Sequence, residues 1–152
     1  MEESLTFASK IKELFQLKEV DIRTYSPLTL AYIGDSIYDL VVRTVIVSGG
    51  NTSVNKLHHY TIAYVKAPAQ AMMAKMLLPY LTEEEQDILR RGKNAKPYTK
   101  AKNATMDEYK KATSMEALVG YLYLTGREER LLELMKLGME LIDAQEKSNG
   151  RK

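Results

Sequence analysis

Apolar residues recur at helical spacing along most of the chain, and no segment alternates steadily between apolar and polar residues. An apolar side chain every three or four positions is typical of amphipathic helices, whereas strict alternation is typical of half-exposed strands. The segments between the apolar runs are short. The sequence therefore predicts an all-α fold, a helical bundle of about seven or eight helices.

Capping residues mark the longest of these helices. Ser26 followed by Pro27 is a favourable start, because serine caps a helix and proline fits its first turn. The glycine pair at residues 49–50 predicts its end. Further helices are expected near the N-terminus, from 54 toward 67, from 68 to 78, from 106, from 113 to 124 and from 127 to 146.

A short helix is predicted after Thr82. Thr82 with Glu85 three residues later matches a capping box, in which each side chain bonds the other's backbone N–H. Gly92 predicts the end of this helix, and the Gly, Pro and Asn content that follows predicts a loop.

The composition fits one compact domain. The chain has 152 residues, of which 45% are hydrophobic and 28% charged, enough for a single sizeable core. Residues 1–146 are assigned to this domain and residues 147–152 to a frayed tail. No apolar run reaches the ~18 uninterrupted residues of a membrane span. The first residues also lack the pattern of a signal peptide, so we expect a soluble, cytoplasmic protein.

Cysteine is absent, which excludes a disulfide framework, a thiolate nucleophile and a cysteine-based zinc site. Metal binding would have to use oxygen ligands or the two histidines, His58 and His59. We expect these histidines to pack or to bond the backbone, and we leave them outside the site. Oxygen ligands favour Mg²⁺ or Mn²⁺.

Cationic residues are concentrated between Ile88 and Thr105, a segment that contains no acid. The net charge of the whole chain is only +2, so this segment stands out by position. A solvated, flexible loop would explain it, and so would contact with a phosphate backbone. The candidate contact residues are Arg90, Arg91, Lys93, Asn94, Lys96, Lys100 and Lys102.

A carboxylate stands in the middle of the longest apolar helix. Asp35 is flanked by Ile33 and Ile37, and burial of a charge without compensation costs several kcal/mol. Asp39 has Arg43 four residues later as an ion-pair partner, but Asp35 has the like charge of Asp39 at that position. The alternatives for Asp35 are a cationic partner from another helix, a solvated helix edge, or a metal ion.

Glu116 is the second carboxylate of this kind. Thr113 three residues before it would make a capping box, which is the ordinary explanation. Both acids, however, accompany a glycine in an apolar helix, Gly34 and Gly120, where glycine costs up to about 1 kcal/mol relative to alanine. If these glycines let two helices cross closely, the carboxylates would face each other. Facing carboxylates repel unless a cation such as Mg²⁺ lies between them.

These segments carry a resemblance to a known family. LAYIGDS at residues 30–36, followed by EALVG at residues 116–120, resembles the two signature segments of the ribonuclease III catalytic domain. The resemblance extends roughly from Ser26 to Leu134 and includes Leu57-His58 and the RGKNAK segment at residues 91–96. The chain is most similar to the small variant, Mini-ribonuclease III, which lacks a double-stranded-RNA-binding domain.

The resemblance implies a helical homodimer that cleaves double-stranded RNA with Mg²⁺, or Mn²⁺ as a substitute. Asp35 and Glu116 would be metal ligands at a catalytic centre in which water attacks a backbone phosphate in line, leaving 5′-phosphate and 3′-hydroxyl ends. Ala31 and Thr113 stand where full-length relatives have further acids, as the small variant's leaner acidic set implies. The implied substrate is a precursor of large-subunit (23S) ribosomal RNA, and no DNA or membrane partner is expected.

Two other functions remain open from the sequence. Some ribosome-associated relatives keep this fold as non-catalytic RNA-binding subunits, although the presence of both Asp35 and Glu116 disfavours that function. A helical protein-interaction module would leave the aspartate and the basic segment without an explanation.

Overall fold

The computed structural model describes residues 6–95 and 105–150, and every regular element in these ranges is helical. This confirms the all-α prediction. Two short 3₁₀ turns, Ile22–Thr24 and Leu78–Tyr80, accompany the α-helices. The α-helices are α1 (Phe7–Leu14), α2 (Pro27–Val47), α3 (Val54–Val65), α4 (Ala67–Leu77), α5 (Glu83–Asn94), α6 (Met106–Leu124) and α7 (Glu128–Ser148).

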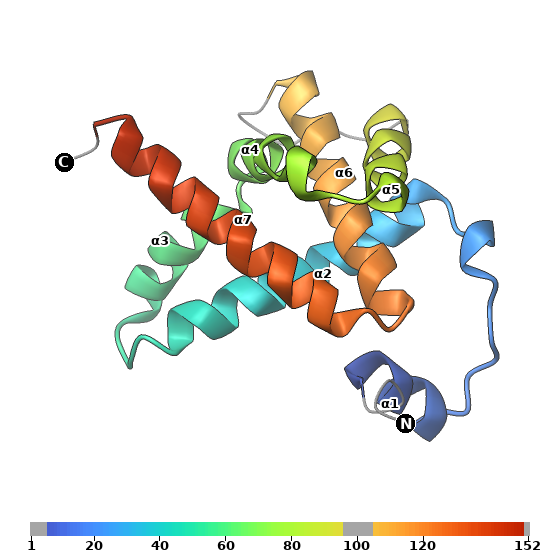
Figure 1. Cartoon of the computed structure of the whole chain (residues 1–152). Coiled ribbons are helices and arrows are strands. Elements are labelled where there is room, and N and C mark those ends of the chain that lie inside the picture. Colours follow the sequence, from blue (N-terminus) through green and yellow to red (C-terminus); the bar gives the residue numbers. More distant parts are fainter. Residues whose placement is uncertain (1–5, 96–104, 151–152) are drawn as a thin grey trace.

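Helix α6 is the centre of the bundle. It packs against α2, α4 and α5, and α7 crosses the bundle diagonally, as Figure 1 shows. Its middle section is buried nearly all round, which is typical of a helix enclosed by others. The largest fully buried side chains come from α2, α4, α6 and α7 and form one core: Tyr38, Met73, Leu77, Met115, Leu118, Leu122, Leu134 and Met135. None of the described helices is both long and apolar enough to span a membrane.

The predicted start of α2 and the capping box of α5 are confirmed. The Ser26 hydroxyl accepts a hydrogen bond from the backbone N–H of Thr29 at 3.2 Å. The predicted end of α5 at Gly92 is wrong, because the helix continues to Asn94. A Cβ atom at Gly92 would lie 2.9 Å from the Cα atom of Ser114 on α6. This glycine therefore allows close packing of two helices and does not end one.

Helix α6 is one continuous helix, whereas the sequence suggested two. Its N-cap is Thr105, whose side chain forms a capping box with Glu108. Thr113 lies inside the helix, and its hydroxyl donates to the Tyr109 carbonyl oxygen at 3.0 Å. The capping-box explanation of Glu116 is therefore wrong. Helix α7 continues to Ser148, beyond the expected end at residue 146.

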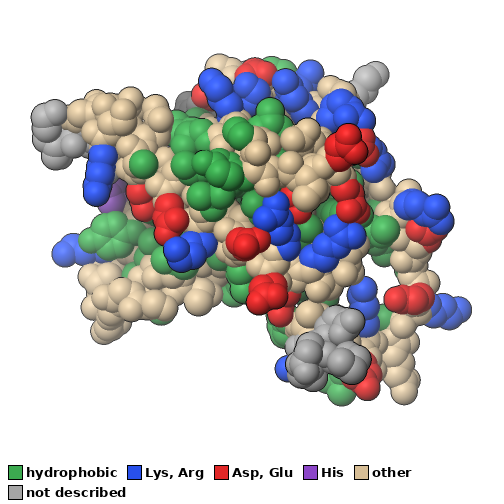
Figure 2. All heavy atoms as spheres, viewed as in Figure 1, with side chains coloured by type: hydrophobic (Ala, Val, Ile, Leu, Met, Phe, Trp, Pro, Cys, Tyr) green, Lys and Arg blue, Asp and Glu red, His purple; other side chains and the backbone are tan. Residues whose placement is uncertain are grey.

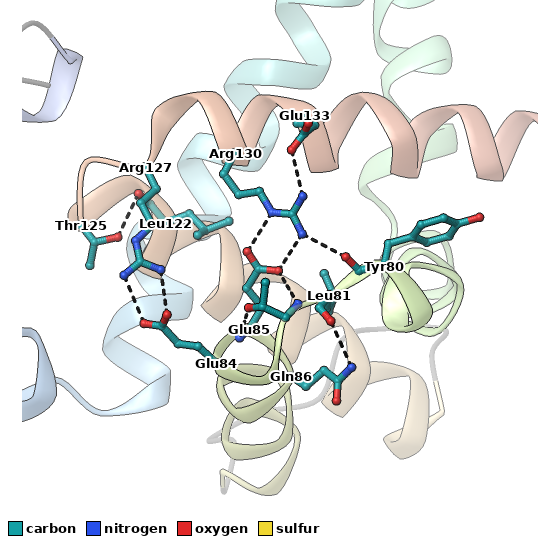
Figure 3. A network of polar contacts seen from close by, with 11 residues as sticks. Tyr80, Leu81, Glu84, Glu85, Gln86, Leu122, Thr125, Arg127, Arg130 and Glu133 are labelled. Carbon is teal, nitrogen blue, oxygen red and sulfur yellow. Dashed lines mark hydrogen bonds and ion pairs between the residues drawn. The ribbon is translucent and has the colours of Figure 1, made fainter. Parts of the chain in front are cut away.

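A buried ion pair fastens α5 to α7 (Figure 3). Glu85, the capping-box acid, is 3% exposed, and Arg130 of α7 donates to both of its carboxylate oxygens at 2.9 Å. The same guanidinium donates to Glu133 at 2.9 Å and to the Tyr80 carbonyl oxygen at 3.0 Å. The hydrogen bond to Arg130 lowers the pKa of Glu85 below its ordinary value. One arginine thus holds the α4–α5 connection against α7.

Substituting Arg130 with methionine should leave the Glu85 carboxylate buried without a cation. The expected loss in the free energy of unfolding is about 3 kcal/mol, measured by urea denaturation. Lys136→Met is the matched control on α7, because Lys136 pairs with Glu140 in solvent. Its loss should stay below about 1 kcal/mol. Equal losses in the two variants would contradict the structural role of Arg130.

Candidate active site

Helices α2 and α6 cross at two glycines. A Cβ atom at Gly34 would overlap the carbonyl oxygen of Glu116 and lie 2.8 Å from the backbone nitrogen of Gly120. A Cβ atom at Gly120 would overlap the carbonyl oxygen of Leu30. Only glycine lets the two backbones approach this closely. The prediction that these glycines mark a close helix crossing is confirmed.

The crossing brings the two candidate carboxylates together. Asp35 follows Gly34 on α2, and Glu116 is the residue of α6 whose backbone Gly34 faces. Burial raises the pKa of Glu116 to about 8, and the charge of Asp35 and a hydrogen bond to it add to the rise. A hydrogen bond from the Gln70 side chain acts in the opposite direction. Among the described residues, no Lys or Arg forms an ion pair with Asp35 or Glu116.

Asp35 is not buried among the apolar residues that flank it in the sequence. Asp35 is exposed and Glu116 is the half-buried member of the pair. The buried stripe of α2 passes through Gly34 and Tyr38, and Asp35 stands at the edge of that stripe. Asp39 is half-buried beside it and pairs with Arg43 at 2.9 Å, as the sequence predicted. Asp35 therefore lies at a solvated helix edge next to Glu116, a position that is also compatible with a metal ion between the two carboxylates.

The two carboxylates share an open cleft of about 380 Å³ between α2 and α6. Ala31 and Thr113 are the two positions at which the resemblance implied acids in full-length relatives, and both line this cleft. Tyr109 also lines it and was not predicted from the sequence. Tyr109, Thr113 and Glu116 have the spacing of one helix face. This relation was missed because the sequence suggested two helices in place of one continuous α6. The remaining lining residues are Leu28, Tyr32, Ile33 and Ser36.

The donor set of the cleft fits a small divalent cation. Mg²⁺ commonly binds proteins through one or two carboxylates and keeps several waters. Asp35 and Glu116 supply two carboxylates that repel each other and lack a cationic side-chain partner in the described part of the chain. Residues 6–95 and 105–150 contain no cluster of three or more His, Asp or Glu side chains suited to a metal. His58 and His59 lie exposed on α3, outside the cleft.

The raised pKa of Glu116 predicts how stability depends on pH without metal. Glu116 ionises near 4.5 in the unfolded chain and near 8 in the folded protein, so the unfolded state binds fewer protons between these values. The contribution of Glu116 to the free energy of unfolding is therefore present below about pH 4.5 and is lost as the pH rises through about 8.

Glu116→Gln removes this titration. In EDTA, the melting temperature of the variant minus that of the wild type should increase by several degrees from about pH 5 to about pH 8, measured by thermal unfolding. A difference in melting temperature that does not change with pH would show that Glu116 is not held in a destabilising environment.

The candidate phosphate contacts lie partly on a helix. Arg90, Arg91, Lys93 and Asn94 are exposed in the last turns of α5. The loop expected after Gly92 is therefore wrong for Lys93 and Asn94, which still belong to the helix. Arg90 forms an ion pair with Asp87. The other three candidates, Lys96, Lys100 and Lys102, lie outside the described residues.

Helix α6 adds basic residues that were not predicted from the sequence. Helix α5 packs against α6, with Gly92 next to Ser114. The hydrogen bond to Lys111 is the main cause of the lowered pKa of Asp107, and the charges of Lys93 and Lys110 add to it. Figure 2 shows Lys and Arg side chains gathered along this end of the molecule, the upper edge of the view. These residues could have been predicted from the sequence, because Lys110 and Lys111 lie one to two helical turns before Glu116 in the same segment.

Comparison with known proteins supports the resemblance found in the sequence. Residues 28–127 match the family model of the ribonuclease III domain, a range that contains both glycines and both carboxylates of the crossing. A Mini-ribonuclease 3 of Clostridium tetani is 45% identical over 131 residues, which cover 86% of this chain and 87% of that protein. A Mini-ribonuclease 3 of Symbiobacterium thermophilum is 48% identical over 79% of this chain and 92% of its own length. A crystal structure of a Fusobacterium nucleatum protein superposes with a TM-score of 0.72 at 34% identity, covering 80% of this chain and 98% of that one.

Proposed function

The chain belongs to the ribonuclease III family, and from this premise we propose that it is an endoribonuclease that cleaves double-stranded or structured RNA with Mg²⁺, for which Mn²⁺ can substitute. The observation that carries the proposal is the pair of carboxylates, Asp35 and Glu116, at the glycine crossing of α2 and α6. Their cleft is open to solvent, so an RNA backbone can reach it.

Asp35 and Glu116 are proposed as metal ligands, without a role as general acid or base. The metal, when bound, would lower the pKa of water and neutralise charge on the phosphate and the leaving oxygen. The half-buried Glu116 provides a fixed ligand, and the exposed Asp35 provides one that is accessible from solvent. Ala31 and Thr113 line the cleft without a charge, so Asp35 and Glu116 are the carboxylates among its described lining residues. The family resemblance supports 5′-phosphate and 3′-hydroxyl ends as the products.

The biological substrate is proposed to be a precursor of 23S ribosomal RNA, cleaved in the cytoplasm. This part of the proposal rests on the resemblance to the small variant of the family. An A-form duplex is recognised mainly by shape and by contacts to phosphates and 2′-hydroxyls, which suits the basic end of α5 and α6.

A homodimer is proposed on the basis of an apolar stripe on α2. Tyr32, Leu40 and Val47 share one face of this helix and are 81%, 51% and 58% exposed. Exposed apolar residues gathered on one helix face are typical of protein–protein contact surfaces. Because Asp35 lies on the same helix, a dimer formed along this stripe would place the two active sites close to each other.

The direct test is incubation of the purified protein with duplex RNA in Mg²⁺ and in EDTA. We expect cleavage in Mg²⁺ only, and none of single-stranded RNA or duplex DNA. Binding of the duplex without cleavage in either Mg²⁺ or Mn²⁺ would favour the alternative, a non-catalytic RNA-binding subunit. Absence of both binding and cleavage would contradict the proposal altogether.

Neutralising two charges at the end of α5 should weaken RNA binding. The double variant Arg91→Ala and Lys93→Ala should lower duplex affinity and reduce the slope of log affinity against log salt by about one for each phosphate that the protein no longer neutralises. Filter binding across a salt series measures this. Lys136→Ala is the control, because this exposed lysine lies on α7 and pairs with Glu140. A salt slope that is unchanged in the double variant would remove α5 from the RNA-contact surface.

A further inference from the structure

A tyrosine lines the cleft beside the two carboxylates. Tyr109 is half-buried on α6 and shares this cleft with Asp35, Thr113 and Glu116. It precedes Glu116 by close to two helical turns, so both side chains leave the same face of α6. The metal site proposed for Asp35 and Glu116 makes no use of this tyrosine, so its place in the cleft requires an explanation.

The hydroxyl of Tyr109 has no hydrogen-bond partner within residues 6–95 and 105–150. Other tyrosines of the fold use theirs, since Tyr38 donates to the Tyr64 carbonyl oxygen and Tyr64 donates to Asp143, both at 2.6 Å. A phenolic hydroxyl is a good hydrogen-bond donor. The hydroxyl of Tyr109 is therefore available to a ligand that enters the cleft.

Tyr109 lies on the way from the carboxylates to the basic end of α5. Gly92 of α5 packs against Ser114 of α6, and Figure 1 shows the end of α5 and the start of α6 at the same end of the bundle. At the rise of an α-helix, Tyr109 is about 10 Å from Glu116 along the axis of α6. This separation is too long for both side chains to contact one phosphate. A strand that runs from the carboxylates toward the basic residues would bring a neighbouring phosphate to Tyr109.

The composition of the cleft favours a phosphate oxygen as the acceptor. Asp35 and Glu116 make the cleft acidic, and its described lining residues include no Lys or Arg. An RNA strand in an acidic cleft needs hydrogen-bond donors for its phosphates. The hydroxyl of Thr113 already donates to the Tyr109 carbonyl oxygen at 3.0 Å. Tyrosine hydroxyls are among the side-chain groups that bind phosphates, and hydrogen bonds to charged acceptors are the stronger ones.

We propose that Tyr109 is a substrate-binding residue, whose hydroxyl donates to the RNA phosphate next to the one that is cleaved. The proposal rests on the proposed function, in which Asp35 and Glu116 hold the metal at the cleaved phosphate. The contact fixes the position of the strand and does not touch the metal. Loss of the hydroxyl should therefore weaken cleavage while metal binding and the stability of the fold stay unchanged.

The test is Tyr109→Phe in the full-length protein, because this substitution removes the hydroxyl and keeps the ring. We expect kcat/KM for duplex RNA to fall by about 10-fold, as for the loss of one hydrogen bond to a charged acceptor. The Kd for Mn²⁺ without RNA and the melting temperature should equal those of the wild type. Tyr80→Phe is the matched control, since Tyr80 is exposed, precedes the non-basic end of α5 and does not line the cleft. Its kcat/KM should equal that of the wild type.

A single neutral linkage identifies the acceptor. In a duplex with a mapped cleavage position, each phosphate that flanks the cleaved one is replaced in turn by a methylphosphonate. The test and reference duplexes both carry a 2′-O-methyl group at that nucleotide. At one of the flanking positions, the replacement should slow the wild type by about 10-fold. The same replacement should slow Tyr109→Phe by less than about threefold, because the hydrogen bond is already absent.

The possible outcomes separate this role from a structural one. A wild-type kcat/KM in Tyr109→Phe, or an equal loss in Tyr80→Phe, would overturn the proposal. A lower melting temperature or a weaker Mn²⁺ affinity in Tyr109→Phe would show that the hydroxyl supports the fold or the metal site, and would overturn it too. Equal slowing of both proteins by the methylphosphonate would exclude the phosphate contact. Failure of the wild type to cleave duplex RNA would instead refute the proposed function, and this proposal with it.

Discussion

Asp35→Asn and Glu116→Gln are each expected to lower the rate of duplex RNA cleavage by about 10³-fold or more, because a catalytic metal contributes several kcal/mol to transition-state stabilisation. Both substitutions remove a charged ligand and keep the size of the side chain. Duplex binding should persist, since the basic end of α5 and α6 is untouched. Single-turnover cleavage and filter binding separate the two effects.

Asp39→Asn is the matched control for these variants. Asp39 lies one turn beyond Asp35 on α2 but pairs with Arg43 at 2.9 Å and does not line the cleft. Its cleavage rate should remain within a few-fold of the wild type. A similar loss in all three variants would mean that any negative charge on this face supports cleavage, and the assignment of Asp35 would be wrong.

Gly34→Ala is expected to destabilise the whole fold. The new Cβ atom would overlap the Glu116 carbonyl oxygen, which is backbone and cannot rotate away, so α2 and α6 would have to separate. Overpacking at such a contact costs about 3 kcal/mol or more. Urea denaturation measures the loss, and thermal unfolding should show a melting temperature lower by roughly 6–12 °C.

Gly49→Ala gives the comparison for this prediction. Gly49 follows the C-terminal end of α2, and a Cβ atom there would lie 3.3 Å from the Ile46 carbonyl oxygen, without contact to another helix. The expected loss in the free energy of unfolding is below about 1 kcal/mol. If Gly34→Ala is no less stable than Gly49→Ala, the crossing is not as close as the structure has it, and the carboxylates need not face each other.

The helix crossing was predictable because its signals are local. Glycine lowers the stability of a helix, so a glycine near an acid in an apolar helix needs a packing reason. Gly34 with Asp35 and Gly120 with Glu116 both show this combination, which indicated a contact between two segments distant in the sequence. The exposure of Asp35 could not be decided from the sequence, because apolar neighbours do not determine whether a residue lies inside the buried stripe or at its edge. That depends on the angle at which α6 crosses α2.

Other wrong predictions came from sequence motifs that are compatible with more than one structural role. Thr113 with Glu116 has the spacing of a capping box, but Thr105 with Glu108 forms the box that starts α6. Gly92 resembled a helix end because glycine is common there, whereas its role is contact with Ser114.

The central claim is that Asp35 and Glu116 hold one divalent metal site between them. Calorimetric titration of Mn²⁺ into the wild type, Asp35→Asn and Glu116→Gln, without RNA, tests it most directly. We expect saturable binding by the wild type, and affinity that is abolished or at least about 10-fold weaker in each variant. Wild-type affinity for Mn²⁺ in Asp35→Asn or in Glu116→Gln would contradict the claim.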